Sequence, residues 1–140
     1  MALPEIEKMQ MQEGIWTPEL DTIEKIKPTV EYNTRTARYK KIGKLVFVDF
    51  FISGKITALN GTNNYALIRG LPFSARSTNL GIIAINRGIC YNALDVTSEI
   101  SFLVEGNTIR IQKNNGTGAV SWSVTGGTFQ IGGSGVYEIN

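Results

Sequence analysis

The segment KKIGKLVFVDFFISGKI (residues 40–56) decides the fold that we expect for this chain. Its apolar residues alternate as in a β-strand, where successive side chains point to opposite faces of the sheet. One face carries five apolar residues: Val46, Val48, Phe50, Ile52 and Ile56. The other face carries Leu45, Phe47 and Phe51, although a strand that covers one core needs only one apolar face. Something outside that core must therefore cover the second face.

The composition favours a single β domain. The chain has 140 residues, close to the usual size of one domain, with 15 glycines and four prolines. Runs rich in valine, isoleucine and phenylalanine are separated by turn signals such as Asn-Gly and Gly-Gly. The net charge of +2 does not by itself indicate a polyanionic partner.

The chain contains no histidine, which excludes Ser-His-Asp and Cys-His catalysis and histidine metal ligands. Asp49 stands mid-strand between Phe47 and Phe51, and a hydrogen bond to backbone or to a neighbouring chain is favoured there over paired-carboxylate catalysis. Cys90 is the only cysteine, and its apolar neighbours favour a buried, unreactive thiol. We expect no enzymatic activity, no cofactor and no metal site.

The sequence carries neither a signal-peptide pattern nor a run that approaches the ~20 apolar residues needed to span a bilayer. We therefore expect a soluble protein without membrane insertion.

Two parts are expected along the chain: a lead-in over residues 1–13, helical or connected to a stalk, and a head domain over residues 14–140. Trp16 is expected to anchor an extended segment that includes a short strand near Thr29–Tyr32. Five basic residues crowd the stretch that follows: Arg35, Arg38, Lys40, Lys41 and Lys44. An edge strand protected by lysines is favoured there over a nucleic-acid contact, because no aromatic RNA-binding motif accompanies the charges.

The segment ISFLVEGNTIRIQK (residues 100–113) predicts a hairpin with one register. If Gly106-Asn107 forms a type II′ turn, Val104 pairs with Ile109 and Phe102 with Ile111, so that the apolar residues share one face. Residues 80–91 are expected to form a second strand with two apolar faces, and further strands are expected at 119–124, 128–131 and 136–139. The predicted fold class is all-β, an antiparallel, jelly-roll-like β-sandwich.

The two apolar faces also predict an assembly. The inner faces of a sandwich make its core, so the outward residues of the long strand need cover from the Trp16 segment, from another strand or from another copy of the chain. An uncovered apolar patch usually marks an interface. We therefore predict a homo-oligomer whose interface contains Leu45, Phe47, Asp49 and Phe51.

The chain resembles the C-terminal head domains of phage tail fibres and of baseplate receptor-binding proteins. The resemblance rests on GIWTPEL (14–20), RYKKIGKLVFVDFFISGKI (38–56) and IRGLPF (68–73), in this order, and covers about residues 14–73. It implies a homotrimeric β-sandwich at the tail tip of the virion, in contact with other tail or baseplate proteins. It further implies that the head recognises host cell-surface saccharide and has no catalytic activity of its own.

The matching motifs look structural, so they do not identify the saccharide-binding residues. We therefore look for the groups that such a site needs: an aromatic ring that stacks on the sugar and planar polar groups that bind its hydroxyls. Trp122 is the leading candidate, although a place in the core is slightly favoured for it. A second cluster contains Arg87, Tyr91, Asn92 and Asp95, where an ordinary loop is the favoured alternative. The loop at residues 60–64 is a third possibility.

Two other functions stay open at this point. One is a purely structural virion protein that trimerises a fibre or docks on another virion protein without binding glycan. The other is a small enzyme that uses Asp49 or Asp95, or a nucleic-acid binder that uses Arg38 and Lys40.

Overall fold

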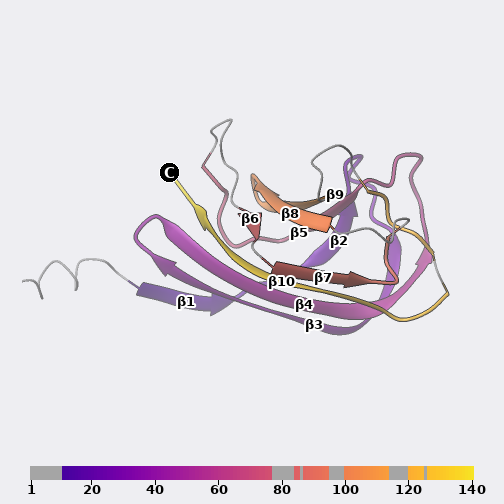
Figure 1. Cartoon of the computed structure of the whole chain (residues 1–140), viewed down its shortest axis with the longest axis horizontal. Coiled ribbons are helices and arrows are strands. Elements are labelled where there is room, and N and C mark those ends of the chain that lie inside the picture. The colour runs from indigo at the N-terminus through magenta and orange to yellow at the C-terminus, as the bar shows by residue number, and fades with distance from the viewer. Residues whose placement is uncertain (1–10, 77–83, 86, 95–99, 114–119, 125) are drawn as a thin grey trace, which may run out of the picture.

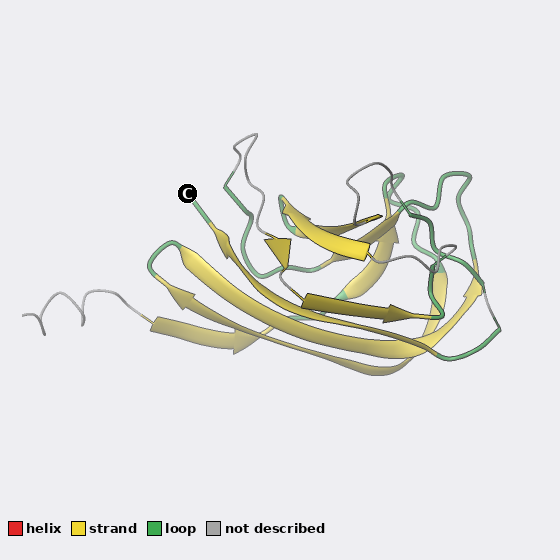
Figure 2. Ribbon diagram, viewed as in Figure 1, coloured by secondary structure: helices red, strands yellow, loops and turns green. Residues whose placement is uncertain are grey.

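The protein is a two-layer β-sandwich (Figures 1 and 2). The computed structural model describes residues 11–76, 84–85, 87–94, 100–113, 120–124 and 126–140, and only the backbone of residues 84–85, 87–89 and 113. Sheet A has the strand order β1 (Met11–Ile15), β3 (Thr29–Ile42), β4 (Leu45–Ala58), β10 (Phe129–Glu138) and β7 (Arg87–Tyr91). Sheet B has the order β2 (Glu19–Thr22), β5 (Ala66–Arg69), β9 (Thr108–Lys113), β8 (Ile100–Glu105) and β6 (Ala84–Ile85).

All neighbouring strands are antiparallel, and the chain passes repeatedly from one sheet to the other, so the predicted antiparallel sandwich is confirmed. The described residues contain no helix, and hence none that could cross a membrane.

Strands β3 and β4 form a long hairpin that builds most of sheet A. Ile42 pairs with Leu45 across the turn at Gly43. A strand does begin at Thr29, as expected, but it is not short, because β3 runs from Thr29 to Ile42. The register shifts between Tyr32 and Thr34, and such irregularities bend a sheet. The hairpin accordingly curls up toward sheet B at one end (Figure 1).

The inner face of β4 lies in the core, as its alternation predicted. All five of its apolar residues are buried: Val46, Val48, Phe50, Ile52 and Ile56. Phe50 meets the edges of Trp16 and Phe102, each at a centroid distance of 5.9 Å, and so joins the two sheets. Trp16 is buried and donates its indole N–H to the Arg38 carbonyl at 3.1 Å, which confirms its anchoring role.

The hairpin of β8 and β9 has the predicted register, with Val104 opposite Ile109 and Phe102 opposite Ile111. These four residues are buried. Gly106 has φ +62° and Asn107 has no positive φ, as a type II′ turn requires.

Three other expectations were wrong. The strand expected over residues 80–91 is divided, because β6 pairs with β8 in sheet B whereas β7 pairs with β10 in sheet A. The strands expected at 128–131 and 136–139 are one strand, β10. At 119–124, the described residues form only isolated bridges through Ser121 and Trp122.

The lead-in expected over residues 1–13 overlaps sheet A, because β1 begins at Met11 and pairs with β3. Residues 1–10 lie outside the described part of the chain, so the helical or stalk-connecting character expected for them stays a prediction.

Tyr137 provides a stability prediction. Its side chain is fully buried, and its hydroxyl donates to the Phe73 carbonyl at 2.7 Å and accepts from the Phe73 N–H at 3.3 Å. Burial raises the pKa of Tyr137 from 10.0 to about 12. We expect Tyr137→Phe to cost about 1–3 kcal/mol at pH 7, because it leaves the two Phe73 groups without this partner. Urea unfolding at pH 7 measures this loss.

The same substitution has a pH dependence of defined sign. The unfolded chain loses the Tyr137 proton near pH 10 and the folded chain only near pH 12. Stability from this group is therefore complete below pH 10 and falls as the pH rises toward 12, by up to about 3 kcal/mol. Burial also raises the pKa of Cys90, from 9.0 to about 12, but that contribution is common to both chains. The advantage of the unaltered chain over Tyr137→Phe should therefore shrink between pH 10 and 12, and a constant difference would contradict this assignment.

Candidate interaction site on the outer face of sheet A

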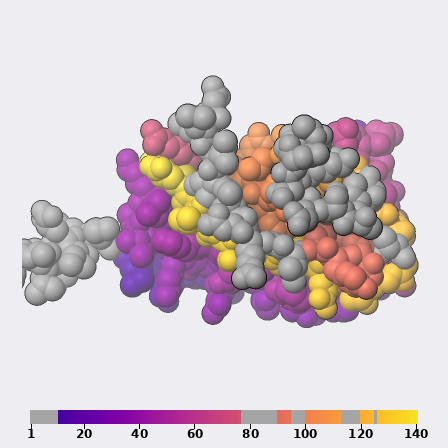
Figure 3. Space-filling view, viewed as in Figure 1, coloured from indigo at the N-terminus to yellow at the C-terminus, as the bar shows by residue number. Residues whose placement is uncertain are grey.

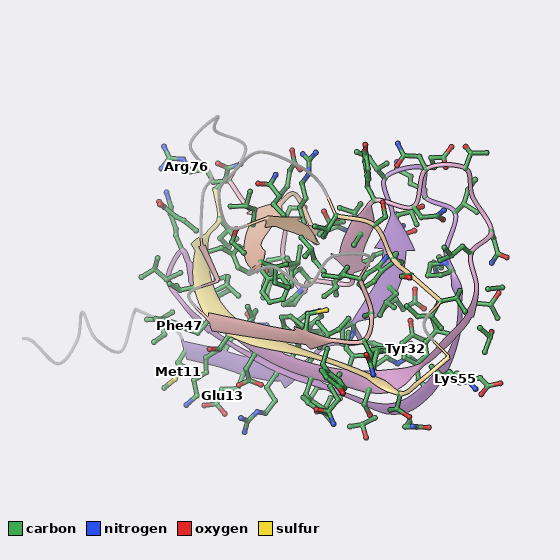
Figure 4. The ribbon with its side chains drawn as sticks, turned by 45° about the vertical axis from the view of Figure 1, so that its right-hand side comes forward. Met11, Glu13, Tyr32, Phe47, Lys55 and Arg76 are labelled. Atoms are coloured by element: carbon green, nitrogen blue, oxygen red, sulfur yellow. The ribbon has the colours of Figure 1, made fainter. Side chains whose placement is uncertain are left out.

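The side of sheet A that faces away from sheet B, here called the outer face, carries the residues of the two-faced strand. The backbone register arranges its side chains in rows that cross β1, β3, β4 and β10. Row 1 is Met11, Ile42, Leu45 and Glu138; row 2 is Glu13, Lys40, Phe47 and Val136; row 3 is Ile15, Arg38, Asp49 and Ser134; row 4 is Thr36, Phe51 and Gly132. Figure 4 shows that Met11, Glu13 and Phe47 gather at one end of sheet A.

Several large apolar side chains of this face are exposed. The exposed fraction is 45% for Leu45, 43% for Phe47, 60% for Met11 and 82% for Ile15. Phe51, further along β4, is half-buried. The Trp16 segment does not cover these residues, because Trp16 packs between the sheets. Within one chain, the second apolar face of β4 therefore stays in contact with solvent at Leu45 and Phe47.

A shallow groove of about 800 Å³ crosses this face. Its lining consists of rows 2 and 3 together with Gly14, Tyr39, Val48 and Gly135. Ser134 of β10, which stands opposite Asp49, is small, so the groove floor is low beside Asp49. The groove thus offers apolar surface and charged groups side by side.

The charges in the groove are paired between neighbouring strands. Arg38 Nη2 lies 3.2 Å from Asp49 Oδ2, and Lys40 Nζ lies 3.6 Å from Glu13 Oε1. Pairs this exposed contribute little to stability, about 0–1 kcal/mol. The two pairs nevertheless balance the charges, so that the four groups together carry no net charge. Asp49 thus bonds to a side chain on the adjacent strand, where a bond to backbone or to another chain was expected.

The basic stretch of β3 is not the lysine-protected edge that we expected. Residues 38–42 are covered by β1, which pairs with them along their whole length. Two of the cations are paired within the groove, and Arg35 lies 3.9 Å from Glu19 and over the Tyr32 ring at 4.2 Å. Much of the positive charge that a polyanion would need is therefore compensated inside the chain.

The structure separates the candidate saccharide residues. Trp122 is 1% exposed and donates its indole N–H to the Asp21 carbonyl at 2.7 Å, so its ring is a core element and cannot stack on a ligand here. The prediction of Trp122 as a binding residue was wrong, and its alternative place in the core is confirmed. Asp95 lies outside the described residues, and Arg87 is described only by its backbone, which pairs with Ser134.

Tyr91 and Asn92 do lie together at the surface, where β7 ends. Tyr91 is 64% exposed and stands opposite Gln130 of β10. Asn92 is exposed with φ +59°, and its amide lies 3.5 Å from the Thr128 carbonyl. The space-filling view shows surface atoms of this segment beside those of the C-terminal segment (Figure 3). Sequence reasoning missed Gln130, whose outward position follows from its place between the buried residues Phe129 and Ile131.

Hydrogen bonds to Glu24 and Lys27 hold the loop at residues 60–64. The carboxylate of Glu24 accepts from the Thr62 hydroxyl at 3.0 Å and from the Asn63 N–H, and the Asn60 amide donates to the Lys27 carbonyl at 2.9 Å. These bonds occupy polar groups that a saccharide would need, so they favour a structural role for this loop.

A scan against protein-family models finds no family that matches this chain, and a search of curated proteins finds no matching relative.

Proposed function

We propose that this chain is a non-catalytic attachment module: the receptor-binding head of a phage tail fibre or baseplate, which assembles as a homotrimer and binds host cell-surface saccharide. The observation that supports it most is the outer face of sheet A, where Leu45, Phe47 and Ile15 stay exposed beside neutralised ion pairs. Such a surface suits contact with another protein. In this proposal the head sits at the tail tip and also contacts other tail or baseplate proteins.

The support for a saccharide site comes from the end of β7. Tyr91 presents an exposed ring, the amide of Gln130 stands on the neighbouring strand, and Asn92 follows directly. An aromatic face beside planar amides is the combination that binds the apolar face and the hydroxyls of a sugar ring.

Tyr91→Ala tests the saccharide proposal. We expect it to weaken binding to host cells, or to a glycan identified on an array, by at least about tenfold, because the stacking ring is lost. Binding is measured by titration of labelled protein on cells and by calorimetry with the glycan. Tyr65→Ala is the matched control, since Tyr65 is 40% exposed but stands opposite Ser121, outside β7 and β10. Equal effects of the two substitutions would contradict a site at Tyr91.

A structural role without glycan binding is the second candidate, and the same outer face supports it. The chain would then trimerise a fibre or dock on another virion protein. Glycan arrays and cell-binding assays that stay blank, together with a particle of about three times the 15.4 kDa of one chain, would favour this role over the first.

A further inference from the structure

We infer that rows 1 to 4 on the outer face of sheet A form the contact between copies of this chain, and that the rotation axis of the assembly runs along β3 and β4. Each row of one copy then meets the same row of its neighbour. This inference rests on the homo-oligomer of the proposed function and assigns the surface and the orientation of that assembly.

The distribution of apolar residues favours this orientation. Leu45, Ile42 and Met11 of row 1 lie at one end of the face, and Phe47 and Val136 follow in row 2. A rotation axis parallel to the strands keeps every row at its own height, so apolar rows meet apolar rows. An axis across the strands, through the middle of the four rows, would reverse their order. Row 1 would then meet row 4, where Phe51 stands between Thr36 and Gly132. Contact between apolar rows removes the most apolar surface from water, at about 25 cal/mol per Å².

The charges make row 3 self-complementary. The cations Arg38 and Lys40 stand on β3, whereas Glu13 stands on β1 and Asp49 on β4. Row 2 and row 3 therefore each contain one cation and one anion on adjacent strands. When the axis runs between β3 and β4, Arg38 of one copy faces Asp49 of the next in row 3. In row 2 the anion stands on β1, so Lys40 of one copy faces Phe47 of the next. The ion pair of row 3 can then extend into a network across the interface.

The same charges decide between possible occupants. A polyanion or an anionic membrane surface would require unpaired cations, but Arg38 and Lys40 are already bound to carboxylates of their own chain. A second copy needs no such surplus, because it supplies both signs in row 3. Of these occupants, a further copy of this chain is the one that fits the face.

A mixing experiment tests the inference. Asp49→Arg puts two cations in row 3, and Arg38→Asp puts two anions there, so each variant alone should associate about 100-fold more weakly than the unaltered chain. An equimolar mixture should regain at least about tenfold of this loss, because row 3 of one variant is complementary to row 3 of the other. In a mixed trimer, two of the three contacts are complementary in this way. The ion pair within each chain is broken in both variants, so its loss cannot explain a recovery on mixing. Sedimentation equilibrium of each variant and of the mixture measures the association.

Controls keep the outcome clear. The exposed pair of Arg110 and Glu105, 3.5 Å apart on sheet B, offers the matched variants Glu105→Arg and Arg110→Glu, which should leave association unchanged. The fluorescence of buried Trp16 and Trp122 reports whether each variant is folded. Asp49→Lys and Arg38→Glu repeat the mixing test in row 3, in case one of the first variants does not fold.

The outcomes separate this inference from the proposed function. An unaltered chain that associates, with mixtures that do not recover, places the contact on another surface and overturns the inference while the assembly stands. An unaltered chain that stays monomeric at tens of micromolar overturns both the inference and the proposed assembly. In that case, saccharide binding through Tyr91 can still be tested, because the monomer carries Tyr91.

Discussion

Trp122→Ala is expected to lower the free energy of unfolding by about 3–5 kcal/mol, the largest loss that one core truncation commonly produces. The Trp122 side chain is 1% exposed, and its indole N–H donates to the Asp21 carbonyl at 2.7 Å. Its backbone N–H bonds the Asn64 carbonyl at 3.0 Å and ties this segment to the loop before β5. Because domains are stable by only about 5–15 kcal/mol, such a loss removes a large part of the total. Urea unfolding followed by the fluorescence of the remaining Trp16 measures it.

Two further variants show where that loss comes from. Trp122→Phe keeps much of the buried volume but loses the bond to Asp21, so it should cost about 1–2 kcal/mol plus a smaller packing loss. Tyr91→Ala removes an exposed ring and should change stability by less than about 0.5 kcal/mol. A Trp122→Ala chain that is as stable as the unaltered one, but no longer binds saccharide, would contradict the core assignment.

Gly70→Ala is expected to destabilise the fold by more than about 4 kcal/mol or to prevent folding. Gly70 follows β5 and has φ +113°, a conformation that residues with a side chain rarely adopt. A Cβ at this position would lie 2.2 Å from the carbonyl oxygen of Thr17, which is backbone and cannot swing aside. The substitution must therefore separate the end of β5 from the segment that leads into β2. Soluble expression and thermal unfolding measure the effect.

Gly106→Ala is the matched control. Gly106 also has a positive φ, +62°, but a Cβ there would meet nothing within 4 Å. The backbone conformation alone should cost about 1–2 kcal/mol. Equal losses for the two substitutions would show that the contact with Thr17 has no role.

The local parts of the fold could be predicted well from the sequence. The β8–β9 hairpin followed from the Gly106-Asn107 turn and from the polarity of the flanking residues, because turn and alternation specify the same register. The inner face of β4 followed from alternation alone. The separate strands expected around the Gly132–Gly135 stretch were wrong, because pairing with β4 on one side and β7 on the other holds β10 extended through glycines that read as a turn.

The candidate sites were less predictable. Tyr91 and Trp122 have similar sequence surroundings, an aromatic ring among small or polar residues, yet one is exposed and the other is buried. Their difference depends on which sheet each segment joins. Tyr91 ends a strand of sheet A, whereas Trp122 bridges to Leu94 and reaches Asp21 of sheet B. These contacts join residues far apart in the chain, so no local pattern reports them.

The alternation of residues 45–56 by itself determined that β4 has two apolar faces, because the period of a strand is a property of the backbone. Only the tertiary structure decided what lies on each side. It placed Trp16 and Phe102 against Phe50, and it left Leu45 and Phe47 uncovered by the rest of the chain. The physical reason is that burial depends on long-range packing between the sheets, whereas side-chain direction depends on neighbouring residues alone.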